Sequence, residues 1–267
     1  MPGFSCPFPP TNGLNPVPFL TVPDVFNPDH CLTLRRRIEE MWKSGLISDK
    51  SLESDPGVTF TFNPLVAVDP VFASIIINPN LLGAAIQLLG RNIRLQHSQA
   101  MVKLPSPKDN RKWHVDGAWP NYYPSVAGRV PLLELNASIM LSENCAKPGG
   151  GSLNLVPGSH LLPPPTPDEF TRLGTSLEGA VEILQPPGSM TLFHNAIWHS
   201  GGNNRTLVPR INIFITFCHA WMQPVDFVPS DIPFLHTLNA LNRRLIEGPH
   251  GSNQSRFYYD DGLPISG

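Results

Sequence analysis

Alternation of apolar and polar residues with a period of two dominates the middle of the chain and predicts β structure. It is clearest over residues 130–141 and recurs over 92–104 and 211–217. Successive side chains of a strand point to opposite faces. One face of 130–141 therefore carries Leu133, Leu135, Ala137, Ile139 and Leu141, and the other carries Glu134, Asn136, Ser138 and Met140. A half-polar inner face of this kind suits a barrel that encloses a polar ligand.

Helices are predicted on either side of these strands. Asn27-Pro28-Asp29 supplies an N-cap and a proline at the first helical position, which predicts a helix over 24–45. Asn78-Pro79 does the same for a helix over 80–89 that ends at Gly90. The apolar run 72–77 is interpreted as a strand, and the polar segment 230–245 as a helix. Shorter elements are expected at the following ranges: strands at 112–117, 152–156, 181–184 and 190–193, and a small helix at 168–173.

Many short strands separated by turns, with helices beside them, predict a mainly β jelly roll with flanking helices. The 267 residues fit one such domain, 1–267. Residues 1–23 contain seven prolines and are interpreted as an extended arm. The tail 248–267 is expected either to lie across a cleft or to be disordered.

Composition excludes several classes of partner. The net charge is -2 and no basic stretch stands out, so neither nucleic acid nor an anionic membrane is expected. No run approaches 18 apolar residues, and the N-terminus lacks a basic segment followed by an apolar one. The four cysteines show no paired spacing. We therefore expect a cytoplasmic protein that acts on a small molecule, with a homodimer as its oligomeric state.

The stretch Lys112-Trp113-His114-Val115-Asp116-Gly117 carries the first chemical signal. Residues two apart on a strand share a face, so His114 and Asp116 can reach one ion from a single strand. They are two of the three ligands of a facial triad of two histidines and one carboxylate, which leaves coordination positions open on ferrous iron. The pair alone is weak, because this spacing arises by chance in many proteins.

The second half of the signal lies downstream. His199 is followed by Ser200-Gly201-Gly202, and Arg210 starts the next predicted strand eleven residues later. An imidazole at this place completes the triad, and a guanidinium offers a fork of donors that matches a carboxylate. His194 is a rival for the third ligand, because Arg205 stands eleven residues after it. Spacing alone leaves both histidines open.

The segments from Trp113 to Trp221 resemble the phytanoyl-CoA dioxygenase family of Fe(II)/2-oxoglutarate oxygenases. The matching pieces are WHVD, a Pro-Gly-Gly-Gly-Ser turn leading into Leu-Val-Pro-Gly-Ser-His, and the HS-G-x-N-x(6)-R element. The resemblance implies a cupin-like double-stranded β-helix with iron on His114, Asp116 and His199. It also implies that Arg210 holds the C5 carboxylate of 2-oxoglutarate, and it favours His199 over His194.

The same resemblance extends to further positions. Family members carry polar or Met side chains on the strand before the HxD pair, which maps to Gln99 and Met101, and we add Ser138 as a candidate for co-substrate binding. Many members have a hydroxyl two residues after the distal histidine, where this chain has Gly201, so that contact is missing or is supplied by Ser200. The aromatic loop and the polar inner face nominate as substrate-binding residues Trp119, Asn121, Tyr122 and Asn136.

The function that the resemblance implies is oxidation of a small organic metabolite with Fe(II), 2-oxoglutarate and O2. Hydroxylation is the default outcome, with desaturation or epoxidation as variants, and secondary-metabolite biosynthesis is the preferred role. The alternatives are an amino-acid or fatty-acyl hydroxylase, a non-catalytic cupin-like binding protein, and a zinc hydrolase built on the same three ligands.

Overall fold

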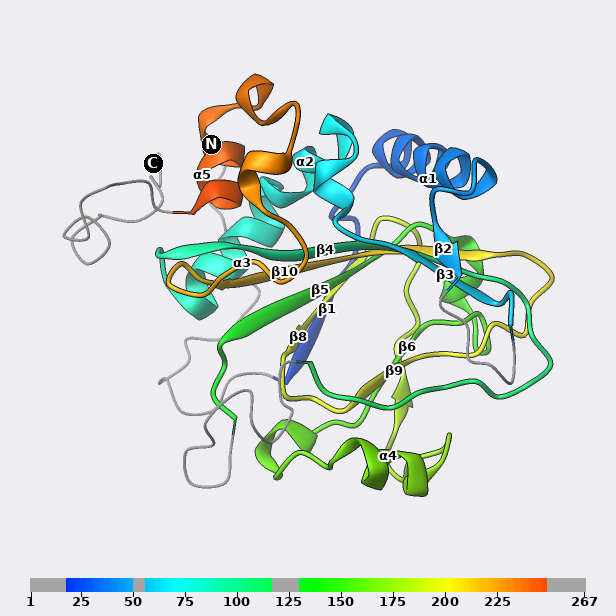
Figure 1. Ribbon diagram of the computed structural model, residues 1–267. Coiled ribbons are helices and arrows are strands. Elements are labelled where there is room, and N and C mark those ends of the chain that lie inside the picture. Colours follow the sequence, from blue (N-terminus) through cyan, green and yellow to red (C-terminus); the bar gives the residue numbers. More distant parts are fainter. Residues whose placement is uncertain (1–17, 50–55, 117–129, 249–267) are drawn as a thin grey trace.

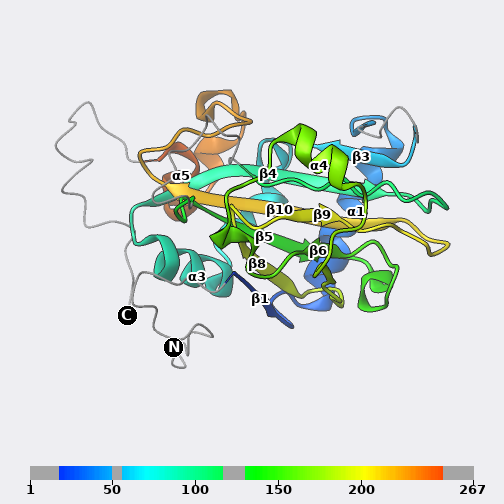
Figure 2. The ribbon, with the colours of Figure 1, turned by 90° about the horizontal axis from the view of Figure 1, so that it is seen from below.

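The computed structural model describes residues 18–49, 56–116 and 130–248, and in this part of the chain two β-sheets lie face to face. The large sheet has seven strands in the order β1-β8-β5-β10-β4-β3-β2, and the small sheet has three in the order β7-β6-β9. Every strand pairing within the two sheets is antiparallel. In the view of Figure 2 the small sheet and α4 lie over the large sheet. This is the jelly roll with flanking helices that the sequence predicts.

The large sheet is built from these strands: β1 (Phe19–Val22), β2 (Ser48–Asp49), β3 (Thr59–Phe62), β4 (Ile93–Lys103), β5 (Glu134–Met140), β8 (Met190–His194) and β10 (Arg210–His219). The small sheet contains β6 (Leu153–Leu155), β7 (Val181–Glu182) and β9 (His199–Gly201). The α-helices are α1 (Pro28–Lys43), α2 (Pro70–Ile76), α3 (Pro79–Leu89), α4 (Pro167–Leu173) and α5 (Ala240–Glu247). The 3-10 helices are Leu65–Ala67, Glu143–Ala146, Ser159–Leu161, Pro229–Asp231 and Leu235–Thr237.

The main core lies between the large sheet and the helices α1, α2, α3 and α5, which cover one of its faces (Figure 1). Alternation in β5 works as the sequence predicts, because Leu135, Ala137 and Ile139 face this core. The opposite face of the sheet meets β6, where a smaller cluster contains Leu153, Leu155 and Phe193 with Phe214 packed against it. The space between the sheets is therefore apolar where β6 packs on the large sheet.

Four of the predicted elements are wrong or misplaced. Residues 72–76 belong to helix α2 instead of a strand, and Ile77 is its C-cap; the Asp69 side chain caps the start of the helix by accepting from Val71 N at 2.9 Å. The predicted helix 230–245 is two 3-10 turns followed by α5. Pro233 interrupts it, since proline lacks an amide donor and disfavours a helical residue before it.

The other two differences concern strands. The segment 112–117 is no strand: within its described part, His114 forms an isolated bridge with His199. The N-terminal arm is also more regular than predicted, because its residues Phe19–Val22 form β1 and pair with β8. Most of the arm, and nearly all of the tail 248–267, lies outside the described residues.

Among the described helices, none is by itself long and apolar enough to cross a membrane; α2 and α3 pass that test only together, as a pair bent by 51°.

Gly202, directly after β9, lies in close contact with Ser152, directly before β6, within the small sheet. Its amide donates to Ser152 O at 2.7 Å, and a Cβ atom added to Gly202 would lie 2.3 Å from that same oxygen. We expect Gly202→Ala to lower the free energy of unfolding in urea by about 2–3 kcal/mol, because the added methyl group must push β6 away.

Gly158→Ala is the matched control for Gly202→Ala. Gly158 has φ +84° but nothing within 4 Å of an added Cβ, so only backbone strain of about 1 kcal/mol is expected. Equal losses of stability in the two variants would contradict the close-approach argument.

Candidate metal centre

Side chains from two segments that are far apart in the sequence converge between the two sheets. Within the described residues, the one group of His, Cys, Asp or Glu whose ligand atoms all lie within 4.8 Å of one another is His114, Asp116 and His199. His199 Nε2 lies 3.3 Å from Asp116 Oδ2, and His114 Nε2 lies 3.7 Å from Asp116 Oδ1. The two imidazole rings are 4.1 Å apart between centroids. Two imidazoles and one carboxylate at this separation form a donor set that one divalent ion can satisfy.

The backbone holds this arrangement. His114 N donates to His199 O at 3.0 Å, and His199 N donates to His114 O at 2.9 Å. Asp116 N then donates to Asn195 O at 3.1 Å. The loop after β4 is thereby bonded to β9 at His114 and to the turn before β9 at Asp116.

Each histidine is oriented by a carbonyl behind it. The Nδ1 of His114 contacts Lys112 O at 3.0 Å, and the Nδ1 of His199 contacts Ile197 O at 2.9 Å. A carbonyl can only accept, so each Nδ1 carries the proton and each Nε2 keeps its lone pair for the centre.

The Asp116 carboxylate and the two imidazoles shift one another's pKa values, and a metal cation would take the place of the proton that Asp116 favours on His199. Burial, together with the neighbouring His199, lowers the pKa of His114 to about 4, so its ring is neutral near pH 7. Burial alone would raise the pKa of Asp116, but His199 and His114 outweigh it and lower the pKa. Burial would lower the pKa of His199, and the Asp116 carboxylate reverses this and raises it.

Asn136 fixes the carboxylate. Its Nδ2 donates to Asp116 Oδ2 at 2.9 Å, and its Oδ1 accepts from Thr216 Oγ1 at 2.7 Å. The sequence nominated Asn136 as a substrate contact, and it does line a cavity. Its amide is nevertheless bonded on both sides, so its clearest role is to orient Asp116.

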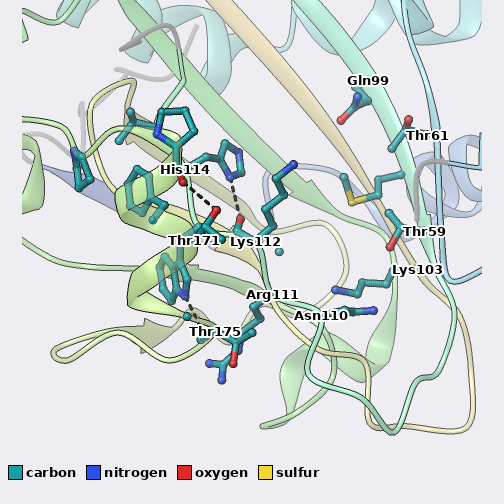
Figure 3. Close-up of a pocket in the computed structure, with 18 of the residues that line it drawn as sticks. Thr59, Thr61, Gln99, Lys103, Asn110, Arg111, Lys112, His114, Thr171 and Thr175 are labelled. Atoms are coloured by element: carbon teal, nitrogen blue, oxygen red, sulfur yellow. Dashed lines mark hydrogen bonds between the residues drawn. The ribbon is translucent and has the colours of Figure 1, made fainter. Parts of the chain in front are cut away.

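Two cavities meet at this cluster. The larger has a volume of about 980 Å³ and is lined by residues of β3, β4, the loop before His114, and α4. Figure 3 shows Thr59, Thr61, Gln99 and Lys103 along one wall, with His114, Lys112 and Thr171 on the other. The smaller has a volume of about 400 Å³ and contains all three residues of the cluster. Gln99, Met101, His114 and Gly201 line both cavities.

Arg210 is a buried cation in the larger cavity. Its side chain is 2% exposed, its Nη1 donates to Asn212 Oδ1, and its Nε has no partner among the described residues. Burial lowers the pKa of the guanidinium. Lys103, also buried, lies directly across from Arg210 in the register of β4 and β10. The buried guanidinium of Arg210, with an Nε that has no partner among the described residues, offers donors at this end of the cavity that fit a carboxylate.

A model of the phytanoyl-CoA dioxygenase (PhyH) family matches residues 19–212. The chain belongs to the phytanoyl-CoA dioxygenase family. The match runs from β1 into β10, so it includes the converging triad and Arg210.

Relatives of this family member include the ectoine dioxygenase of Streptomyces coelicolor, which is 24% identical over 223 residues, covering 74% of this chain and 73% of that one. The crystal structure of HygX from Streptomyces hygroscopicus with nickel, 2-oxoglutarate and hygromycin B bound has a TM-score of 0.61 at 18% identity, covering 81% of this chain and 90% of that chain. The epimerase SnoN in complex with Fe3+, alpha ketoglutarate and nogalamycin RO has a TM-score of 0.62 at 19% identity, with coverages of 88% and 92%. At these identities the two structures show a shared fold.

The structure separates the other nominated residues into three groups. Gln99 and Met101 face the cavities from β4. Ser138 is fully buried and lines neither cavity. Three nominated substrate residues lie outside the described part of the chain: Trp119, Asn121 and Tyr122.

The departure from the family pattern at Gly201 has a local consequence. A Cβ atom at this position would lie 3.3 Å from Arg210 Nη2, so a hydroxyl-bearing side chain here would reach the guanidinium. Ser200 does not replace it, because it lines neither cavity and its hydroxyl donates to Gly201 O at 3.2 Å. Gly201 thus leaves additional room beside Arg210.

Several cavity residues were missed by the sequence interpretation. Lys103 continues the alternation of Gln99 and Met101, so the sequence pattern could have predicted that it lines the same cavity. The position of Gln96 could not be predicted from the alternation. A β-bulge in β4 pairs Thr216 with His97 and Phe217 with Leu95, so Gln96 is an extra residue without a partner in this register. Glu134 was placed on the polar face but given no role.

His194, the rival third ligand, stands apart from the cluster. It ends β8, its ring lies 5.2 Å from the ring of His160, and its Nδ1 accepts from Ala196 N at 2.9 Å. Burial, with His160 adding to it, lowers the pKa of His194 to about 3. These contacts describe a structural histidine that is neutral when the protein is folded.

We expect His194→Asn to lessen the sensitivity of the protein to acid. The unfolded chain protonates this histidine near its ordinary value of 6.5 and the folded chain only near 3, so the stability that the neutral ring contributes is present above pH 6.5 and is lost as the pH falls. An asparagine oxygen can accept from Ala196 N without titrating. The excess stability of the wild type over the variant, measured in urea, should shrink from about pH 7 to about pH 4. A constant difference would contradict the assigned pKa.

Proposed function

We propose that this protein is an Fe(II)/2-oxoglutarate-dependent oxygenase that oxidises a small organic molecule, with His114, Asp116 and His199 as the iron ligands. The observation that carries the proposal is the convergence of this donor set at the edge of a cavity that also contains Arg210. Membership of the phytanoyl-CoA dioxygenase family supports it, as do the iron, nickel and 2-oxoglutarate found in similar structures.

The residues fit such a metal. Both histidines turn Nε2 inward, the carboxylate is ionised, and the side chains of His114 and Asp116 remain 45% and 35% exposed toward the cavities. A closed structural zinc site would use four protein ligands and leave no such opening. When bound, ferrous iron with 2-oxoglutarate and O2 supplies the oxidising power that breaks a substrate C–H bond.

The chain's own residues bind and orient the reactants. Arg210 holds the far carboxylate of 2-oxoglutarate through a buried guanidinium, and Lys103 adds a second positive charge beside it. Asn136 keeps Asp116 in one orientation, and Phe193, whose ring lies 5.0 Å from that of His199, packs behind the distal ligand. The apolar residues Trp113, Val115 and Phe170 line the larger cavity and limit water around the centre.

The identity of the substrate is a finer proposal. We infer a metabolite of secondary biosynthesis, because the similar structures include an enzyme from nogalamycin biosynthesis and a complex with hygromycin B. Hydroxylation is the outcome proposed first. The homodimer and the cytoplasmic location stay predictions from the sequence.

The function is tested in two steps. Fe(II) and 2-oxoglutarate are first added to the protein without oxygen, and the visible charge-transfer band is recorded. Oxygen is then admitted in the presence of each member of a metabolite library, and the succinate formed is measured. Products should gain one oxygen atom or lose two hydrogens. His199→Ala should abolish the band and succinate release, because two ligands do not retain the metal, whereas His194→Asn should keep both. Loss in His194→Asn with retention in His199→Ala would contradict the ligand assignment. Hydrolysis with zinc and no use of 2-oxoglutarate would favour the hydrolase instead.

Arg210→Ala should raise the KM for 2-oxoglutarate by about a hundredfold while changing the KM for the primary substrate much less. The variant removes the charged partner of a buried carboxylate, at a cost of about 3 kcal/mol, and each 1.4 kcal/mol is a factor of ten. Arg205→Ala removes the same charge from an exposed position on the adjoining loop and is the control. An unchanged KM in Arg210→Ala, or an equal effect of Arg205→Ala, would refute this role.

A further inference from the structure

His97 lines the smaller cavity as part of a row of side chains that crosses three neighbouring strands. It pairs with Thr216 of β10, and Thr216 pairs with Asn136 of β5 (Figure 1). All three residues line the cavity. Thr216 Oγ1 donates to Asn136 Oδ1 at 2.7 Å, and Asn136 bonds Asp116. Neighbouring strands are about 4.8 Å apart, so the backbone of His97 lies roughly 10 Å across the sheet from the residue that holds Asp116.

One ring nitrogen of His97 is occupied from behind the cavity. Its Nδ1 lies 2.8 Å from Asp226 Oδ2, and the side chain of Asp226 is 3% exposed. Ser98 N donates to the same oxygen at 3.3 Å. A carboxylate oxygen only accepts, so the nitrogen beside it carries a proton. Because a buried carboxylate is costly unless donors or a cation meet it, Asp226 fixes the orientation of the ring.

The other ring nitrogen of His97 is accessible. Nδ1 is buried, although the side chain as a whole is 23% exposed. Among the described residues, Nε2 has no partner, and it does not belong to the buried atoms. With Nδ1 protonated, Nε2 accepts a hydrogen bond when the ring is neutral and donates one when the ring is charged. A hydroxyl group can donate and accept, so it fits both forms.

The distance from Arg210 separates His97 from the co-substrate. Lys103 pairs with Arg210, and His97 with Thr216, in the same ladder of β4 and β10. His97 and Lys103 are six residues apart on β4, which is roughly 20 Å along the strand. A molecule of 2-oxoglutarate held by Arg210 is far shorter than this. The group that meets His97 therefore belongs to the molecule that is oxidised.

The surroundings of His97 favour a neutral group on an apolar skeleton. Leu153, Phe214 and Val225 line the same cavity and offer apolar contacts. Asp226 already places a negative charge beside the ring, so even a protonated His97 needs no anion from the ligand. A single hydroxyl group among carbon atoms matches both features.

We propose that His97 determines specificity by binding, through Nε2, a hydroxyl group of the substrate that is oxidised. This rests on the oxygenase function proposed above. The volume of about 400 Å³ limits the part of the substrate held here to a small ring or a short chain.

Three probes that share a cyclohexane ring test the proposal: cyclohexanol, fluorocyclohexane and cyclohexanecarboxylate. Their dissociation constants are measured by calorimetry on the full chain with Fe(II) and 2-oxoglutarate, without oxygen. The wild type should bind cyclohexanol about fivefold more tightly than fluorocyclohexane, which is the effect of one net hydrogen bond. No binding of cyclohexanol, or equal binding of these two probes, would overturn the proposal. So would a preference for the carboxylate that disappears when His97 is replaced, since it would indicate an anion site.

Two amide variants assign the preference to Nε2. His97→Asn places its Nδ2 near the position of Nδ1, so it keeps a donor for Asp226 but removes Nε2, and the preference for cyclohexanol should be lost. His97→Gln extends its amide to the position of Nε2 and should retain the preference. His236→Asn changes an exposed histidine that lines neither cavity and should behave as wild type.

The dissociation constant of 2-oxoglutarate separates this role from a structural one. It should be unchanged in all three variants, because His97 lies far from Arg210. A preference for cyclohexanol that survives in His97→Asn would refute the assignment. Loss of the preference in His97→Asn together with weaker binding of 2-oxoglutarate would refute it as well, because the residue would then support the fold of the site.

Failure of the oxygenase function is distinguishable in the same experiment. If Fe(II) and 2-oxoglutarate do not bind in the first titration, the proposed function fails. The probe series is then measured on the metal-free wild type and His97→Asn, where a lost preference for cyclohexanol would still support the hydroxyl site and a retained one would exclude it.

Discussion

The pair of backbone hydrogen bonds between His114 and His199 is the contact on which the site depends. It joins the loop after β4 to β9 of the small sheet, so this backbone pairing sets the distance between the two imidazoles. Side-chain orientation then follows from carbonyls on either side, which leave both Nε2 atoms toward Asp116. A donor set fixed by backbone bonds is preorganised, so little conformational entropy remains to be lost when an ion binds.

Charge is distributed along β10 and β4 in a way that gives the site a direction. Arg210 and Lys103 lie at one end of the paired strands, and Gln96 and His97 lie near the other, with Met101 and Gln99 between them. The Arg210 end of the strands is therefore separated along the sheet from the end that carries Gln96 and His97. Burial strengthens each of these interactions, since the low dielectric of the interior screens them less than water does.

The same strands serve two purposes because their two faces have different environments. One face of β5 buries Leu135, Ala137 and Ile139 against the helices, which stabilises the sheet. The other face carries Glu134 and Asn136 toward the cavity and the centre. The rigidity that the apolar face provides keeps the polar face in register, and a site on strands is positioned more accurately than one on loops.

Much of this could be predicted from the sequence. Alternation predicts the β sheets because burial of one face requires a period of two. Spacing suggests a metal site at His114 and Asp116, and the resemblance to the family adds His199 and Arg210. Local signals failed where several were in conflict, as in 72–77, where an Asp69 cap outweighs a β-branched run.

What only the tertiary structure decided is which distant groups meet. The resemblance favoured His199 over His194, and the structure places His199 beside Asp116. The pairing of Lys103 with Arg210 and the bulge that brings Gln96 to Glu134 depend on strand register, which is set by packing between elements that no local pattern records.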